Sequence, residues 1–166
     1  MNTHYLDLLK ELQIDNEETP IFIETGTHKG AGTEAWASVF DEVHTIELSD
    51  SLYEYCCKTY DFPNVTFIHG ASTDVLEELV KTVDKPYILF LDAHGSGGDT
   101  AYHETVGRLG SPVLLEIECV KNNPPKYILV DDMADFGGGT NYPSQDSILK
   151  KIYEIGDYEL LSINLR

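Results

Sequence analysis

The sequence contains little positive charge. Its 166 residues include 11 lysines and arginines against 29 aspartates and glutamates, which gives a formal net charge of −18. Proteins bind duplex DNA and anionic membranes through positive surfaces that neutralise phosphate groups. The charge balance therefore argues against nucleic acid or a membrane surface as the main partner.

Long hydrophobic runs are also missing, and we expect no leader sequence. A membrane-spanning helix needs about 18 or more consecutive apolar residues, and no such stretch is present. Residues 1–12 lack a basic stretch followed by an apolar segment, so we expect no secretory signal. Cysteine is scarce: Cys56 and Cys57 are adjacent, and Cys119 is far from both along the chain. We therefore expect reduced thiols and a cytoplasmic protein.

The remaining composition is that of a globular protein. Apolar residues make up 42% of the chain, aromatic residues 10% and charged residues 24%. These proportions are typical of a folded domain, and a chain of this length can bury one sizeable core. We expect residues 1–166 to form a single domain, with residues 1–19 as an N-terminal helix and loop.

Short apolar runs alternate with helical patterns along the chain. The expected strands are residues 21–24, 43–48, 65–68, 86–91 and 127–130, with a last strand at 158–165. The expected helices are residues 33–40, 52–60, 74–83, 112–120 and 144–152, with Thr33 as the N-cap of the first helix and Pro112 as the first residue of the fourth. This alternation predicts an α/β fold, a doubly wound and mostly parallel sheet with helices on both faces.

Polar residues follow each of the five predicted parallel strands. Because the carboxyl ends of parallel strands meet at one edge of a sheet, we expect these residues to surround a single site. They are residues 24–30, Glu47, Ala71 and Ser72, Asp92 and His94, and Asp131 and Asp132.

The glycine-containing loop after the first strand allows two interpretations. Residues 30–35 match the dinucleotide-binding pattern GxGxxA, but the first glycine of that match lies six residues beyond the strand end at Glu24. The dinucleotide turn normally begins directly after the strand. Residues 24–30 match the pattern ExGxxxG, which begins at the strand end. A helix-start loop without any ligand is a third, simpler alternative.

The order of these residues resembles that of the class I S-adenosylmethionine-dependent methyltransferases, over about residues 20–160. In that family the glycine loop holds the methionine part of the cofactor, and the acid that ends the second strand accepts hydrogen bonds from both ribose hydroxyls. The loop after the third strand contacts the adenine. The resemblance implies a Rossmann-like methyltransferase fold with S-adenosylmethionine as cofactor. The cofactor-binding residues that it implies are Glu24, Thr25, Gly26, Thr27, Gly30, Glu47, Leu48, Ser49, Ala71, Ser72 and Asp92.

Three aspartates end neighbouring strands of the predicted sheet. Asp92, Asp131 and Asp132 would repel one another at one edge unless a cation lay between them. Their oxygen ligands favour Mg²⁺, Ca²⁺ or Mn²⁺ over zinc, and the arrangement resembles that of catechol-type and metal-dependent sugar O-methyltransferases. The alternative is that these aspartates cap helices or lie as simple charges on the rim.

His94 follows Asp92 by two residues and is the candidate general base. An unperturbed imidazole titrates near neutral pH, so it can accept the proton of an acceptor hydroxyl. We take His94 and Asp92 as the candidate catalytic pair. The alternative is a loop histidine that takes no part in chemistry. Residues 95–111 contain several glycines, and we expect them to form a lid or an acceptor-recognition insert.

The sequence thus predicts an O-methyltransferase for a small hydroxylated acceptor, with a sugar or glycan hydroxyl favoured and Mg²⁺ assistance expected. Two other classes stay open: an NAD(P)-dependent oxidoreductase, and a non-catalytic module that binds the cofactor. Family members usually end with a sixth strand and an antiparallel seventh. Here we expect an abbreviated C-terminal hairpin, whose exposed sheet edge a homodimer could cover.

Overall fold

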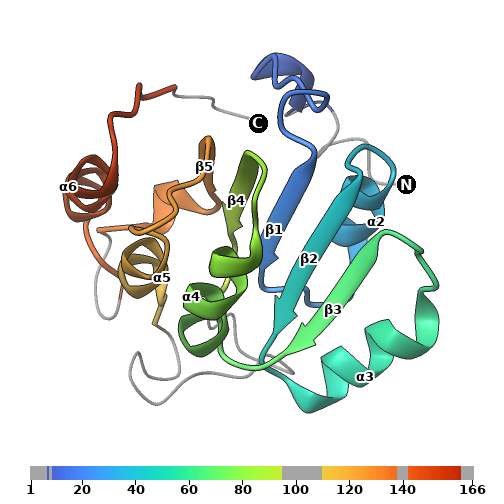
Figure 1. Cartoon of the computed structure of the whole chain (residues 1–166). Helices are drawn as coiled ribbons and strands as arrows, with labels where there is room; N and C mark the ends of the chain where they lie inside the picture. The colour runs from blue at the N-terminus through green and yellow to red at the C-terminus, as the bar shows by residue number, and fades with distance from the viewer. Residues whose placement is uncertain (1–6, 8, 95–109, 138–141, 162–166) are drawn as a thin grey trace.

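A five-stranded parallel sheet forms the centre of the molecule. The computed structural model describes residues 7, 9–94, 110–137 and 142–161. The strands are β1 (Ile21–Thr25), β2 (Glu42–Glu47), β3 (Val65–His69), β4 (Tyr87–Leu91) and β5 (Tyr127–Val130). They lie in the order β3-β2-β1-β4-β5, and every neighbouring pair is parallel (Figure 1). The predicted parallel α/β sheet is confirmed.

Helices cover both faces of this sheet (Figure 1). They are α2 (Ala31–Ala37), α3 (Asp50–Thr59), α4 (Ser72–Thr82), α5 (Val113–Cys119) and α6 (Gln145–Ile155), with a short 3₁₀ turn, η1, at Met133–Asp135. Alternate side chains of each strand point to opposite faces. Ile21 and Ile23 therefore pack with α4, α5 and α6, whereas Phe22, on the other face, packs with α2.

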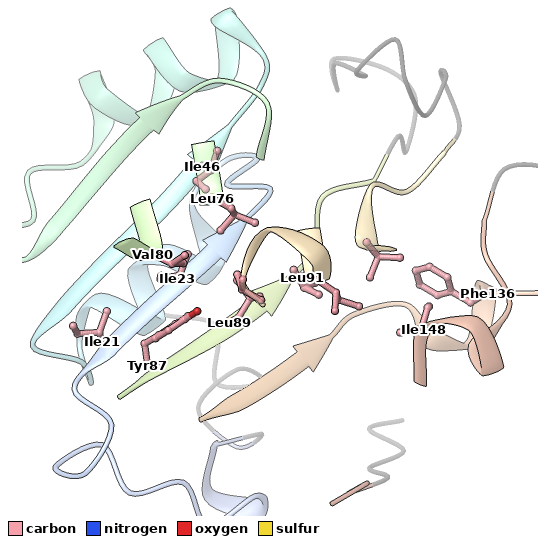
Figure 2. Packing of buried hydrophobic residues seen from close by; sticks show 13 residues of the cluster. Ile21, Ile23, Ile46, Leu76, Val80, Tyr87, Leu89, Leu91, Phe136 and Ile148 are labelled. Atoms are coloured by element: carbon pink, nitrogen blue, oxygen red, sulfur yellow. The ribbon is translucent and has the colours of Figure 1, made fainter. Parts of the chain in front are cut away.

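Two hydrophobic clusters, one on each face, explain why the strands are continuously apolar. The larger cluster joins β1 and β4 to α4, α5 and α6, and it includes Leu76, Leu89, Phe136 and Ile148 (Figure 2). In the smaller cluster the rings of Phe22 and Trp36 stack with their centroids 4.3 Å apart. Strands that are buried on both faces do not show polar alternation, so the apolar runs were reliable strand signals.

Several helix starts differ from the prediction. Thr33 is not an N-cap, because the N-cap of α2 is Gly30 in the left-handed conformation, with φ 77°. Thr33 lies inside the helix, where its hydroxyl has another partner. Helix α4 begins at Ser72, two residues earlier than expected, and Pro112 is the N-cap of α5 rather than its first residue. Ser144 caps α6 as predicted, since its side chain accepts a hydrogen bond from the Ser147 amide.

The predicted last strand is not found where the structure describes it. Residues 158–161 form no strand, and residues 162–165 lie outside the described residues. Tyr158 instead donates its hydroxyl to the Pro125 carbonyl at 2.6 Å, which ties this segment to the loop before β5. Within the described residues β5 pairs with β4 alone. Cover of this edge by a second copy of the chain stays a prediction.

The two remaining segments are described only in part. Residues 7 and 9–11 are helical, as expected, and Leu9 is buried in the smaller cluster. The predicted lid or insert at residues 95–111 lies outside the described residues except for Gly110 and Ser111. Within the described part of the chain, no helix has the length and apolar character needed to cross a bilayer.

Candidate functional site

The glycine loop between β1 and α2 is packed directly against the end of β4. The Gly26 amide donates to the Ile46 carbonyl at 2.9 Å, and the Asp92 amide donates to the Thr25 carbonyl at 3.1 Å. A Cβ atom on Gly26 would lie 2.6 Å from the Asp92 carbonyl oxygen, and its φ of 89° also favours glycine. Only glycine at this position lets β1 and β4 end so close together.

Side chains of α3 and its C-cap hold the same loop from the outside. A Cβ atom on Gly30 would lie 2.5 Å from the Tyr60 ring, so the ring lies directly against the loop backbone. The Tyr60 hydroxyl donates to the Lys29 carbonyl at 2.9 Å, and the Cys56 thiol donates to the His28 carbonyl at 3.3 Å. The loop is therefore held in shape by protein contacts before any ligand binds.

Glu24 supports the loop from beneath. Its side chain is 2% exposed and accepts hydrogen bonds from Thr33 at 2.6 Å and Thr45 at 2.7 Å, and from the Trp36 indole at 3.0 Å. Thr27 is linked to the same network through a 2.6 Å contact between its hydroxyl and that of Thr45. Burial raises the pKa of Glu24, although the three donors oppose that rise. The carboxylate thus joins β1, β2 and α2 under the loop.

Glu47, at the end of β2, has a carboxylate that two backbone amides hold in place. One carboxylate oxygen accepts the His28 amide at 2.7 Å, and the other accepts the Ser49 amide at 2.8 Å. The carboxylate is only 7% exposed, so these two amides fix its orientation. Each oxygen keeps a further lone pair, which suits two adjacent hydroxyl groups. Leu48 lies half-buried between Glu47 and Ser49.

The loop after β3 lies beside Glu47. The Gly70 amide donates to the Glu47 carbonyl at 2.9 Å, which joins the ends of β2 and β3. Ala71 is the N-cap of α4, and Ala71 and Ser72 are both buried. The structure therefore brings together three of the predicted segments: the glycine loop, Glu47, and the pair Ala71 and Ser72.

The aspartates after β4 and β5 surround His94. Its Nδ1 atom lies 3.6 Å from Asp92 Oδ1, and its Nε2 atom lies 3.3 Å from Asp132 Oδ2. Asp131 instead accepts the Asp132 amide at 2.8 Å, and Asp132 has a φ of 52°, in the left-handed region. Burial, with the nearby charges of Asp131, Glu24, Asp132 and Glu116, raises the pKa of Asp92 to about 8.

These aspartates do not form a ready metal site. Within the described residues, no three His, Cys, Asp or Glu side chains are close enough together to hold a metal ion. The imidazole of His94 lies between Asp92 and Asp132, and Asp131 is engaged with the backbone amide of Asp132. A metal at the three aspartates would need these side chains to rearrange, so the donor set does not fit a metal as it stands.

Glu116 is a site residue that the sequence analysis missed. It lies fully buried on α5, and the hydroxyls of Ser72 and Thr25 face its carboxyl group. Burial raises its pKa to about 7. A signal was present, because Val113, Glu116, Ile117 and Val120 follow the i, i+3, i+4, i+7 spacing of a buried helix face. An acid within that stripe marks a special position.

Comparison with known proteins identifies the fold. No protein-family model matches the chain, and no curated protein sequence matches it. Among solved structures, the O-methyltransferase TomG from Streptomyces achromogenes, in complex with S-adenosylmethionine, matches with a TM-score of 0.58 and 17% identity over 92% of this chain and 65% of that one. The present chain thus spans slightly less than two thirds of that protein.

Two further structures agree with this match. The methyltransferase domain of bacterial CtHen1-C has a TM-score of 0.59 and 9% identity, over 93% of this chain and 84% of that one. A methyltransferase dependent on S-adenosylmethionine, from Anabaena variabilis, has a TM-score of 0.53 and 14% identity, over 78% and 51%. The fold is that of the class I S-adenosylmethionine-dependent methyltransferases, as the sequence predicted.

Proposed function

We propose that the protein is an S-adenosylmethionine-dependent O-methyltransferase for a small hydroxylated acceptor. The observation that carries this proposal is the arrangement around Glu47. Its carboxylate is fixed by two backbone amides, one of them from the glycine loop, and both oxygens still have acceptor capacity for a ribose diol. A hydrogen bond therefore joins the residue proposed to hold the ribose to the loop proposed to hold the amino-acid end of the cofactor.

Charge favours this cofactor over NAD(P). Glu24, Glu47, Asp92 and Glu116 lie at the carboxyl ends of the strands or directly behind them, and no lysine or arginine within the described residues is buried. These acids at the carboxyl ends of the strands would repel a pyrophosphate, whereas they would attract a ligand that carries a sulfonium ion and an ammonium group. In addition, Gly30 is the N-cap of α2, so most of the GxGxxA match lies inside a helix rather than in the turn after the strand.

Each segment has a role when the cofactor is bound. Glu47 would hold the two ribose hydroxyls, the backbone of residues 26–30 would hold the amino-acid end, and Ala71 and Ser72 would contact the adenine. The bound cofactor supplies a methyl group on a positively charged sulfur. The protein contributes alignment of the acceptor and placement of charge.

His94 would act as the general base. A new bond forms between the acceptor oxygen and the methyl carbon, the bond from that carbon to sulfur breaks, and the hydroxyl proton moves to the imidazole. Asp92, 3.6 Å from Nδ1, orients the ring, and Asp132 lies on its other side. The separation from Asp92 is longer than a hydrogen bond, and catalytic contacts often shorten only when substrate binds. Asp132 is 44% exposed, so the outer side of this pair is accessible to an acceptor.

For the acceptor we favour a sugar or glycan hydroxyl. Such a group is polar and uncharged, so it suits an acidic surface that would repel a phosphate backbone. Mg²⁺ assistance stays a prediction that the side-chain geometry does not favour, and no step of the proposed transfer depends on it.

The proposal is tested by calorimetric titration with S-adenosylhomocysteine, with NAD as the comparison ligand. We expect S-adenosylhomocysteine to bind and NAD to bind at least tenfold more weakly. Glu47→Gln should reduce the affinity for S-adenosylhomocysteine by about 10-fold or more, because an NH2 group, which donates hydrogen bonds, replaces one of the two acceptor oxygens. Glu54→Gln, an exposed change on α3, is the matched control. A preference for NAD, or an unchanged affinity in Glu47→Gln, would contradict the proposal.

A further inference from the structure

Glu116 is a buried acid that the proposed transfer leaves unused. It is completely enclosed on α5, and within the described residues its carboxylate oxygens make no hydrogen bond of regular geometry. The hydroxyls of Ser72 and Thr25 lie near it and offset part of the effect of its burial, yet burial still raises its pKa to about 7. Buried carboxyl groups are normally well paired, so one that is held this weakly requires an explanation.

Glu116 lies close to the proposed cofactor site at the carboxyl ends of the strands, which is called the crevice below. Thr25 directly precedes the glycine loop, and Ser72 directly follows the N-cap of α4, so the carboxyl group lies behind two segments of the nucleoside site. Its charge also acts on Asp92, at the end of β4. Glu116 therefore contributes to the electrostatic potential of the crevice without forming its surface.

In the described part of the chain, no buried cation balances this charge. Within the part of the chain that the structure describes, every lysine lies at least partly exposed, and none pairs with Glu116. Enclosing a carboxylate without a counter-ion costs free energy, which either a proton or a positively charged ligand offsets. A cationic ligand gains attraction in such a pocket, and a neutral ligand of the same shape does not.

We propose that Glu116 is a buried counter-charge through which the crevice favours the cationic methyl donor over the neutral thioether product. This inference rests on the proposed function and adds to it a selectivity of donor over product. The charge acts through space, so direct contact is not required. Unit charges about 8–12 Å apart, at an effective dielectric constant of about 20–40, change an affinity by about 3- to 30-fold.

The test measures the affinities of three ligands by calorimetry. S-adenosylmethionine carries a positive sulfur, sinefungin carries a positive amine near the same place, and S-adenosylhomocysteine carries a neutral sulfur. In Glu116→Gln we expect the two cationic ligands to bind about 3- to 30-fold more weakly and S-adenosylhomocysteine to change less than about twofold. Glu118→Gln is the matched control, since it lies on the same helix but pairs on the surface with Lys121 and Lys151.

The possible outcomes separate the two proposals. If Glu116→Gln weakens all three ligands equally, or none of them, the counter-charge role is wrong and the proposed function stands. If the wild-type protein binds none of the three, the proposed function and this inference both fail. If Glu116→Gln does not fold, the affinities of the wild-type protein test the inference. Tighter binding of S-adenosylhomocysteine than of sinefungin to the wild-type protein would overturn it.

Discussion

Two buried glutamates, Glu24 and Glu116, occupy contrasting surroundings on opposite faces of the sheet. Glu24 accepts hydrogen bonds from three side chains, and its burial is compensated by them. Glu116 is equally buried, but within the described residues its carboxylate makes no hydrogen bond of regular geometry, although the hydroxyls of Ser72 and Thr25 lie near it. The comparison teaches that burial alone does not define the role of an acid: one carboxylate stabilises the glycine loop, and the other leaves charge for a ligand to neutralise.

The largest expected effect is on Glu24. Glu24→Ala would remove the carboxylate to which the Trp36 indole and the Thr33 hydroxyl donate and would open a cavity between β1 and α2. We expect the free energy of unfolding to fall by about 3–5 kcal/mol, measured by urea denaturation. A loss below about 1 kcal/mol would show that the network does not hold the loop.

The second prediction concerns pH and Asp92. Its pKa is raised from the ordinary value of 3.8 to about 8 in the folded protein, so the folded state binds the proton more tightly than the unfolded state. Stability contributed by the protonated group is therefore lost as pH rises from about 4 to about 8. Between about pH 4 and pH 8, we expect the unfolding free energy of Asp92→Asn to fall by roughly 2–4 kcal/mol less than that of the wild type.

The measurement for Asp92 is a series of denaturation curves over that pH range for both proteins. Glu24 and Glu116 also have raised pKa values, so the variant should keep part of the slope. If the two pH profiles are parallel, Asp92 is not the buried acid that the geometry indicates.

A smaller effect is expected at Thr45, because its replacement removes only one of the three hydrogen bonds to Glu24. Thr45→Val keeps the shape of the side chain but removes a donor to Glu24 and the contact with Thr27. We expect a loss of about 1–2 kcal/mol by urea denaturation. An unchanged stability would mean that the other two donors satisfy Glu24 without Thr45.

The smallest effect has the opposite sign. Glu116→Gln removes a buried carboxyl group whose pKa is raised from the ordinary value of 4.5 to about 7, so the stability contributed by its protonated form is lost as pH rises from about 4.5 to about 7. We expect the variant to be more stable than the wild type by roughly 1 kcal/mol at pH 8 and equally stable at pH 4. A loss of stability at pH 8 would show that Glu116 has a structural partner after all.

The sequence predicted the strands better than the details of the site. Strands such as β4 are buried on both faces, so they read as unbroken apolar runs, and their order along the chain defines the parallel sheet. The N-cap assignment of Thr33 was wrong because its hydroxyl bonds to Glu24, a partner on another element. The donor from Trp36 could not be predicted either, since it depends on how α2 packs against β1.

Local patterns also misled at two other places. Residues 158–161 have the composition of a strand, but the Tyr158 hydroxyl bonds to the Pro125 carbonyl and the segment does not pair with β5. Three aspartates at strand ends predicted a metal, yet in the structure the His94 ring lies between two of them. Spacing shows that residues can meet, and packing decides which of them occupies the space.

The most direct test of the central claim is a crystal structure of the protein with S-adenosylhomocysteine. We predict that both ribose hydroxyls lie within hydrogen-bond distance of Glu47 and that the amino-acid end lies against the backbone of residues 26–30. A nucleoside bound elsewhere, or a crevice closed by the protein's own side chains at saturating ligand, would contradict the account.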